Sequence, residues 1–187
     1  MSHRVTIDGT TIETQRLRLR PWQPDDSVEA LAIYGEADVA RWLAPAMGRI
    51  DEPGRMQAII EDWIAEQTET GRPTGRWAID DLADGKLIGS GQILGLPPEG
   101  EDLELGYQFA PSAWGRGLGS EAGHALAHYA FSHDEEEVFA VVRTGNHHGI
   151  RTAREIGMEW VGETTKYYDL RLQVFRLRKG DLDLPNQ

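Results

Sequence analysis

The fold of this chain is decided by the stretch Trp114-Gly115-Arg116-Gly117-Leu118-Gly119-Ser120-Glu121-Ala122. An apolar stretch typical of a strand, 103–110, precedes it, and a stretch typical of a helix, 122–131, follows it. Glycines in such a turn let several backbone N–H groups point into one concavity, and the start of a helix adds partial positive charge. The pattern therefore predicts an anion site, and a phosphate-bearing cofactor is the first hypothesis.

Two common phosphate-binding motifs do not fit this glycine-rich turn. A P-loop requires Gly-Lys-Ser/Thr, whereas here Ser120 follows Gly119 without a lysine. A dinucleotide-binding turn requires Gly-x-Gly-x-x-Gly, whereas these glycines are spaced Gly-x-Gly-x-Gly. Nucleoside triphosphates and dinucleotides are therefore disfavoured as ligands, and a tight turn without a ligand stays open as the simplest alternative.

The bulk composition indicates one globular domain. The chain has 187 residues, of which 40% are hydrophobic and 27% charged, so a single domain over 1–187 is expected, with a polar tail at about 181–187. Nothing in the sequence is typical of a membrane span or a secretory signal, so the cytoplasm is the default location. The absence of cysteine excludes disulfides, thiolate catalysis and cysteine-bound zinc.

The net charge of −12 argues against nucleic acid and against an anionic membrane as partners. An acidic protein that binds an anionic cofactor needs a local pocket rich in N–H groups, which the glycine-rich turn would provide. The rest of the acidic surface would suit a cationic substrate such as an amine. Alternatively, the charge only keeps the protein in solution.

Hydrophobic periodicity predicts the order strand, two helices, three strands, helix, strand, helix and a final hairpin. This order indicates an α+β fold with a mixed sheet rather than regular βαβ alternation. The expected strands are 14–20, 76–80, 86–94, 103–110, 138–143 and a hairpin from 160 whose second strand covers 167–177. The expected helices follow Asp25 and Asp26, continue over 37–43, cover 55–69 and 122–131, and run from Asn146 to about Gly157.

Several motifs in this order resemble those of the GNAT superfamily of acyl-CoA-dependent N-acetyltransferases, most of all the branch of the ribosomal-protein alanine acetyltransferases (RimJ/RimL type). The motifs are Glu104-Leu105-Gly106-Tyr107, Pro111 and the glycine-rich stretch, Thr14 to Arg20, Gly85-Lys86-Leu87-Ile88-Gly89, and Asn146 to Arg151 with Gly157-Met158. The resemblance implies the GNAT fold, with a mixed, mostly antiparallel central sheet flanked by helices and with splayed central strands. It also implies transfer of an acetyl group from acetyl-CoA to a primary amine.

The same resemblance implies where acetyl-CoA would bind. Pantetheine would lie in the gap beside the splayed strand, against the backbone of Gln108, Phe109 and Ala110. The N–H groups of the turn would hold the pyrophosphate, and the late helix would add further contacts; these residues are Arg116, Gly117, Leu118, Gly119 and Ser120, with Asn146, Gly149 and Arg151. Simpler roles stay open: a solvated turn residue for Arg116, a helix N-cap for Asn146 and a surface ion pair for Arg151.

Glu104 is the candidate general base. An amine must lose a proton to attack a thioester, and a carboxylate on the strand beside the expected thioester would accept it directly or through water. The backbone N–H groups of the splayed strand would polarise the thioester carbonyl. The alternative is an ordinary exposed glutamate on a strand.

The general acid is where the chain departs from the family pattern. Many relatives carry a tyrosine at the position of Ala153, or a serine at the position of Gly149, and neither hydroxyl is present here. Tyr107, Tyr167 or Tyr168 would replace them, or the CoA thiolate leaves without a dedicated acid. The departure motivates a second hypothesis of another class, a non-catalytic acyl-CoA-binding sensor or interaction protein.

Two further sets of residues bear on the ligands. Glu121, His124 and His128 fall on one helical face, but the order His-Glu-x-x-His is absent and no metal is expected. The N-terminal helices, about 25–69, would shape the acceptor site, with Trp22, Trp42 and Trp63 lining it or packing in the core. The acceptor would be a small-molecule amine or a protein N-terminus, and a homodimer is also open because many relatives dimerise.

Overall fold

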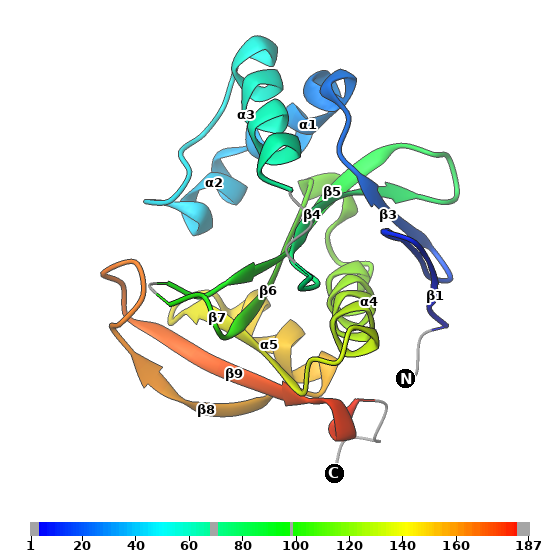
Figure 1. Ribbon diagram of the computed structural model, residues 1–187. Coiled ribbons are helices and arrows are strands. Elements are labelled where there is room, and N and C mark those ends of the chain that lie inside the picture. The colour runs from blue at the N-terminus through cyan, green and yellow to red at the C-terminus, as the bar shows by residue number, and fades with distance from the viewer. Residues whose placement is uncertain (1–3, 68–70, 98, 183–187) are drawn as a thin grey trace.

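The protein is described by a computed structural model that covers residues 4–67, 71–97 and 99–182. One nine-stranded sheet runs through these residues in the order β1-β2-β3-β4-β5-β6-β7-β9-β8 (Figure 1). Its strands are β1 (Thr6–Asp8), β2 (Thr11–Glu13), β3 (Leu17–Pro21), β4 (Gly75–Asp81), β5 (Leu87–Gly95), β6 (Leu103–Phe109), β7 (Glu137–Arg143), β8 (Glu159–Thr164) and β9 (Leu172–Arg178). All neighbouring pairs are antiparallel except β6 and β7, which run parallel.

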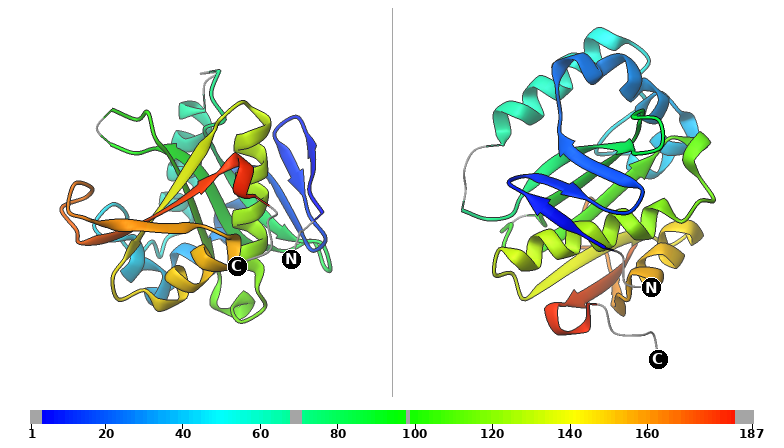
Figure 2. Two further views of the ribbon diagram at one scale, coloured as in Figure 1. Left: turned by 90° about the horizontal axis from the view of Figure 1, so that it is seen from below. Right: turned by 90° about the vertical axis from the view of Figure 1, so that its right-hand side faces the viewer.

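Helices cover both faces of the sheet (Figures 1 and 2). They are α1 (Ser27–Tyr34), α2 (Ala37–Leu43), α3 (Pro53–Glu66), α4 (Leu118–Ser132) and α5 (His147–Ile156). A core that includes Ile33, Ile60 and Ala78 lies under α1 and α3, and a larger core that includes Leu126 and Ile79 lies under α4. Because β4 is covered on both faces, nearly all of its residues are buried rather than alternating. None of the described helices is long and apolar enough to cross a membrane.

The central strands β6 and β7 separate soon after they meet. Their parallel pairing is registered at Glu104 and Phe139, near the start of both strands. In contrast, every residue of β6 is in register with β5, and every residue of β7 is in register with β9. Beyond Glu104 the sheet therefore opens into two halves, which confirms the predicted splay.

Two boundaries differ from those predicted by four residues or more, and one hairpin is additional. The helix α4 begins at Leu118 rather than at 122, because Gly117 with φ +71° turns the chain directly into the helix. The strand β9 begins at Leu172 rather than at 167, because Tyr168 and Asp169 with φ of +59° and +52° break extended structure. The hairpin of β1 and β2 was not predicted. The expected end of α3 at 69 and most of the polar tail lie outside the described residues.

Candidate functional site

The glycine-rich turn forms an N–H-lined helix start. Gly115 and Gly117 adopt φ of +75° and +71°, the left-handed region that favours glycine. The N–H groups of the first helical turn lack carbonyl partners within the helix, and no side chain of the described residues caps them. Ser120 Oγ donates instead to the Gly117 carbonyl, at 3.0 Å. This helix start is therefore suited to an anionic ligand such as a pyrophosphate.

A buried carboxylate holds the turn in place. Glu121 is fully buried, and its Oε1 accepts hydrogen bonds from Thr14 Oγ1 at 2.6 Å and from Arg16 N at 3.0 Å. Its Oε2 accepts from Arg16 Nε at 2.7 Å, while Arg16 Nη1 donates to the Arg116 carbonyl at 2.8 Å. Burial alone would raise the pKa of Glu121, but the hydrogen bonds from Thr14 and Arg16 outweigh it and lower this pKa. The role of Glu121 in this structure is thus to tie α4 and the turn to the start of β3.

The side chain of Arg116 points to a protein carboxylate. Its Nη2 lies 2.8 Å from Asp81 Oδ2 at the end of β4. A backbone hydrogen bond from Ala83 and the ion pair with Arg116 hold the pKa of Asp81 below its usual value. Arg116 is therefore an ion-paired residue that links the β4–β5 hairpin to the turn, rather than the solvated residue named as the alternative. A contact of its side chain with pyrophosphate would compete with Asp81.

The backbone groups that face the gap between β6 and β7 belong to odd-numbered residues. Ala110 N donates to Ile88 O at 2.9 Å and Leu96 N donates to Asp102 O at 2.8 Å, which fixes the even-numbered residues of β6 as the partners of β5. Tyr107 and Phe109 therefore direct their N–H groups toward β7. The prediction for Gln108 and Ala110 needs correction, because their N–H groups face β5. In addition, the Ala110 carbonyl already accepts from Ala113 N, at 2.9 Å.

The start of α5 lies close against β7. Asn146 Oδ1 accepts from Gly149 N at 2.9 Å, so Asn146 is the helix N-cap. A Cβ at Gly149 would lie 2.9 Å from Val142 Cγ1, too close for any side chain without a shift. Ala153 is fully buried in the larger core. The packing at Gly149 thus leaves no room for a serine without a shift, and the position of Ala153 is enclosed in the core. Arg151 is exposed, and its role remains a prediction.

Glu104 lies at the point where β6 and β7 separate, and it meets one of the three candidate tyrosines there. Tyr168 Oη donates a long hydrogen bond of 3.5 Å to Glu104 Oε2. Burial raises the pKa of Glu104 to about 7, although the hydrogen bond from Tyr168 opposes this shift. Burial and the neighbouring Glu104 raise the pKa of Tyr168 to about 12. A carboxyl group that titrates near neutral pH is suited to accept a proton in catalysis.

The other two tyrosines lie elsewhere. The ring of Tyr107 packs against α4, where a Cβ at Gly123 would lie 3.1 Å from its Cε1. Burial raises the pKa of Tyr107. Tyr167 is buried with Leu96 and Leu172 in a small cluster under the β5–β6 loop. Neither ring is thus a partner of Glu104, and Tyr168 is the candidate that reaches it.

A polar group that sequence reasoning missed lies on the same face of the sheet, under α1 and α3. Arg76 Nη1 donates to Gln92 Oε1 at 3.0 Å, and the guanidinium lies 5.3 Å from the ring centroid of Trp63. The ring of Trp63 also lies 5.5 Å from that of buried Trp22 and 5.7 Å from that of Tyr34. Trp42 instead contacts Arg41, 4.6 Å above its ring. Strand alternation alone does not relate Arg76 and Gln92 to Glu104, because the registers of β4 on β5 and of β5 on β6 are needed as well.

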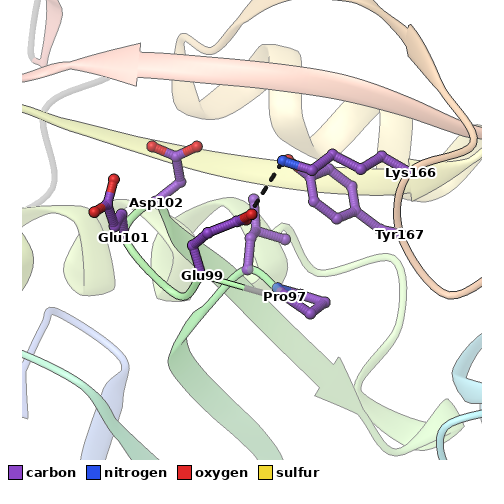
Figure 3. Close-up of a pocket in the computed structure, with 7 residues that line it drawn as sticks. Pro97, Glu99, Glu101, Asp102, Lys166 and Tyr167 are labelled. Atoms are coloured by element: carbon purple, nitrogen blue, oxygen red, sulfur yellow. Dashed lines mark ion pairs between the residues drawn. The ribbon is translucent and has the colours of Figure 1, made fainter.

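A cavity of about 210 Å³ opens between the β5–β6 and β8–β9 loops (Figure 3). Lys166 Nζ points across it to Glu99 Oε2, at 3.6 Å. Asp102, two residues before Glu104, also lines the cavity. So does Tyr167, which directly precedes Tyr168. The cavity therefore adjoins the Glu104 end of β6, whereas the glycine-rich turn follows the other end.

Comparisons with known proteins agree with this geometry. A family model described as an acetyltransferase (GNAT) domain matches residues 16–159. The chain is 26% identical over 171 residues to the uncharacterized protein YkkB of Bacillus subtilis (strain 168), which covers 89% of this chain and 94% of that one.

Solved structures under 25% identical to this chain show a common fold. Aminoglycoside acetyltransferase AAC(6')-Ib in complex with coenzyme A is 16% identical, with a TM-score of 0.70 over 88% of this chain and 96% of the other. The ribosomal-protein-S5-alanine acetyltransferase of Vibrio fischeri is 13% identical, with a TM-score of 0.72 over 93% of this chain and 99% of the other.

Proposed function

The chain belongs to the GNAT acetyltransferase family and uses acetyl-CoA as its co-substrate, and from this premise we propose that it acetylates a primary amine with Glu104 as the general base. The observation that carries the proposal is the position of Glu104 where β6 and β7 separate, with a pKa raised to about 7. Acetyl-CoA supplies the activated acetyl group. The turn from 116 to 120 and the gap-facing N–H group of Phe109 fit its pyrophosphate and its pantetheine.

In this proposal Glu104 handles the proton of the acceptor. The amine nitrogen bonds to the acetyl carbon and the amine proton passes to the Glu104 carboxylate, directly or through water, which leaves a tetrahedral oxyanion. The carbon–sulfur bond breaks as this oxyanion collapses to the amide. The sulfur leaves as thiolate and takes up a proton to become the free thiol of CoA. The N–H group of Tyr107, the nearer of the two to Glu104 along β6, is suited to stabilise the tetrahedral oxyanion, and that of Phe109 is left for pantetheine.

Tyr168 is better suited to position Glu104 than to act as the acid. Its pKa of about 12 makes the hydroxyl a weak proton donor. Its hydrogen bond to Glu104 Oε2 favours the charged carboxylate, because it lowers the pKa of Glu104. The proton held by Glu104 is available to the leaving thiolate, so a separate acid at Gly149 or Ala153 is not required.

The test is amine-dependent release of CoA thiol by the purified protein. Incubation with acetyl-CoA and a panel of primary amines is expected to release thiol, and Glu104→Gln is expected to lower kcat at least about 100-fold, as loss of a general base does. Calorimetry should show unchanged CoA binding. The matched control is Glu13→Gln, an exposed glutamate paired with Arg18 on the N-terminal hairpin.

Two results would contradict the proposal. Full turnover by Glu104→Gln would remove Glu104 as the base. CoA binding without thiol release across small amines and peptide N-termini would favour a non-catalytic acyl-CoA sensor, the second hypothesis drawn from the sequence.

A further inference from the structure

Arg76 presents a partly buried positive charge on the face of the sheet that carries Glu104. Arg76 is in register with Gln92 on β5, and Gln92 is in register with Gly106 on β6. Because side chains alternate along a strand, Glu104 lies on the same face as Gly106, two residues away. The face is covered by α1 and α3, and the Arg76 side chain is only 21% exposed.

The charge of Arg76 is weakly compensated. Glu66 of α3 is its ion-pair partner, but Oε2 lies 3.8 Å from Nη2 and the Glu66 side chain is 68% exposed. The other groups that face it are neutral: the Gln92 amide, the ring of Trp63, and the hydroxyls of Tyr34 and Tyr168. Burial accordingly lowers the pKa of Arg76. A guanidinium in such surroundings is stabilised by an anion that fits its planar fork.

The donors of this cluster extend toward Glu104. The Gln92 side chain lies across Gly106, where a Cβ would come within 2.8 Å of its Nε2. Since Gln92 Oε1 accepts from Arg76, the amide turns its N–H groups toward β6. Tyr168 interacts electrostatically with both Arg76 and Glu104, so its hydroxyl lies within electrostatic range of both charges. The geometry thus brings a cation and a base to one site.

A buried donor with no partner in the described part of the chain lies next to this cluster. The indole of Trp22 is only 4% exposed, and its Nε1 has no hydrogen-bond partner among the described residues. Its ring lies 5.5 Å from Trp63, which itself packs under Arg76. Buried N–H donors without partners are costly, and a bound acceptor group relieves the cost.

We propose that the acceptor is an amino acid or a similar small amine, whose carboxylate binds Arg76 and Gln92 while its amine faces Glu104. This inference rests on the proposed acetyltransferase function and names its substrate class. Polyamines and aminoglycosides fit the site poorly, since their further ammonium groups would face the guanidinium. A peptide N-terminus fits less well than a free amino acid, because an amide takes the place of the carboxylate.

The test compares matched acceptors in pairs. Each amino acid, with β-alanine and γ-aminobutyrate included, is assayed beside its amide and its decarboxylated amine by CoA thiol release. The wild type is expected to prefer the carboxylate at least about 10-fold in kcat/KM. Arg76→Gln is expected to raise KM for the carboxylate about 10- to 100-fold and to leave the decarboxylated partner within about threefold. For the carboxylate, the KM of Arg76→Lys should lie between those of the wild type and Arg76→Gln, because a lysine keeps the charge but lacks the planar guanidinium.

Controls separate this inference from the proposed function. Arg18→Gln removes an equal charge from the exposed face of β3 and should retain the wild-type preference. CoA binding, measured by calorimetry, should be unchanged in all variants. Preference for decarboxylated amines, or a preference for carboxylates that survives Arg76→Gln, would overturn the inference and leave the acetyltransferase function standing.

Absence of turnover with every acceptor would count against the proposed function instead. Titration of the same amino acids into the protein–CoA complex then decides the inference. Binding that Arg76→Gln weakens would support the carboxylate site, and absence of such binding would overturn it.

Discussion

The two ends of β6 build the two parts of the proposed site in different ways. At the C-terminal end, the turn and the start of α4 offer backbone N–H groups, made accessible by Gly115 and Gly117. At the N-terminal end, the groups are side chains, with Glu104 beside Tyr168 and Arg76 two strands away. A backbone site depends on glycine spacing within one stretch of chain, whereas a side-chain site depends on strand register and on a distant loop. A backbone site can therefore be predicted from the sequence, whereas a side-chain site can be identified only once the fold is known.

The largest expected effect is a loss of stability when Glu121, which holds the glycine-rich turn in place, is removed. Glu121→Ala removes the buried acceptor of Thr14 and Arg16, and we expect the free energy of unfolding to fall by about 3 kcal/mol in denaturant titrations. The matched Glu13→Ala, which breaks an exposed pair with Arg18, should cost less than about 1 kcal/mol. Equal losses in the two variants would show that the network around Glu121 is not what fixes the turn.

The side-chain site should respond to pH, which the backbone site should not. Because burial raises the pKa of Glu104 to about 7, its basic form is depleted in acid, and kcat should rise about tenfold per pH unit up to about pH 7 and then level off. CoA affinity should stay nearly flat over the same range. The inflection should be absent from Glu104→Gln, and an inflection that persists there belongs to another group.

The contact between α5 and β7 gives a smaller effect. Gly149→Ser restores the hydroxyl that relatives carry, but its Cβ would crowd Val142 Cγ1 and Asn146 Nδ2, each at 2.9 Å. We expect a loss of about 1–3 kcal/mol in unfolding free energy and no gain in kcat. Wild-type stability together with faster turnover would show that the chain lacks an acid rather than the space for one.

The smallest expected effect is that of Tyr168→Phe. Since the Tyr168 hydroxyl lowers the pKa of Glu104, its removal should move the inflection of the kcat–pH profile upward and reduce kcat at pH 7 roughly twofold to fivefold. Stability should change little, because Tyr168 is 41% exposed. A downward shift of the inflection would contradict the positioning role.

The contrast between the ends of β6 also explains which predictions held. The positions of most elements followed from periodicity, and the GNAT fold with its splayed strands followed from the resemblance of the ordered motifs to that family. The β1–β2 hairpin was missed because each strand has three residues, too few for a periodic pattern. The start of α4 was placed late because glycines suggest a loop, although Gly119 lies inside the helix, in contact range of Tyr107 and Thr152.

In the candidate site, residues that belong to one strand or turn could be predicted from the sequence. The residues that contact them from other parts of the chain could not. Glu104 was named from its motif, but its raised pKa depends on burial by elements far along the chain. The sequence offered three candidate tyrosines and no pattern that selects Tyr168 among them. Tyr168 lies in a loop with positive φ, and such a loop has no hydrophobic periodicity. Arg76 was overlooked because the register of β4 on β5 is needed to bring it to the face of Glu104.

The bond between Thr14 and Glu121 joins residues 107 positions apart, and this separation has a consequence for folding. During synthesis the segment around Thr14 leaves the ribosome long before Glu121 does, so the hydrogen bond between them cannot form until Glu121 has emerged. Contacts of such long range form slowly, since a large loop must close first. The glycine-rich turn therefore acquires its final support only when the two halves of the chain dock, and substitutions near Thr14 should slow refolding as well as weaken the native state.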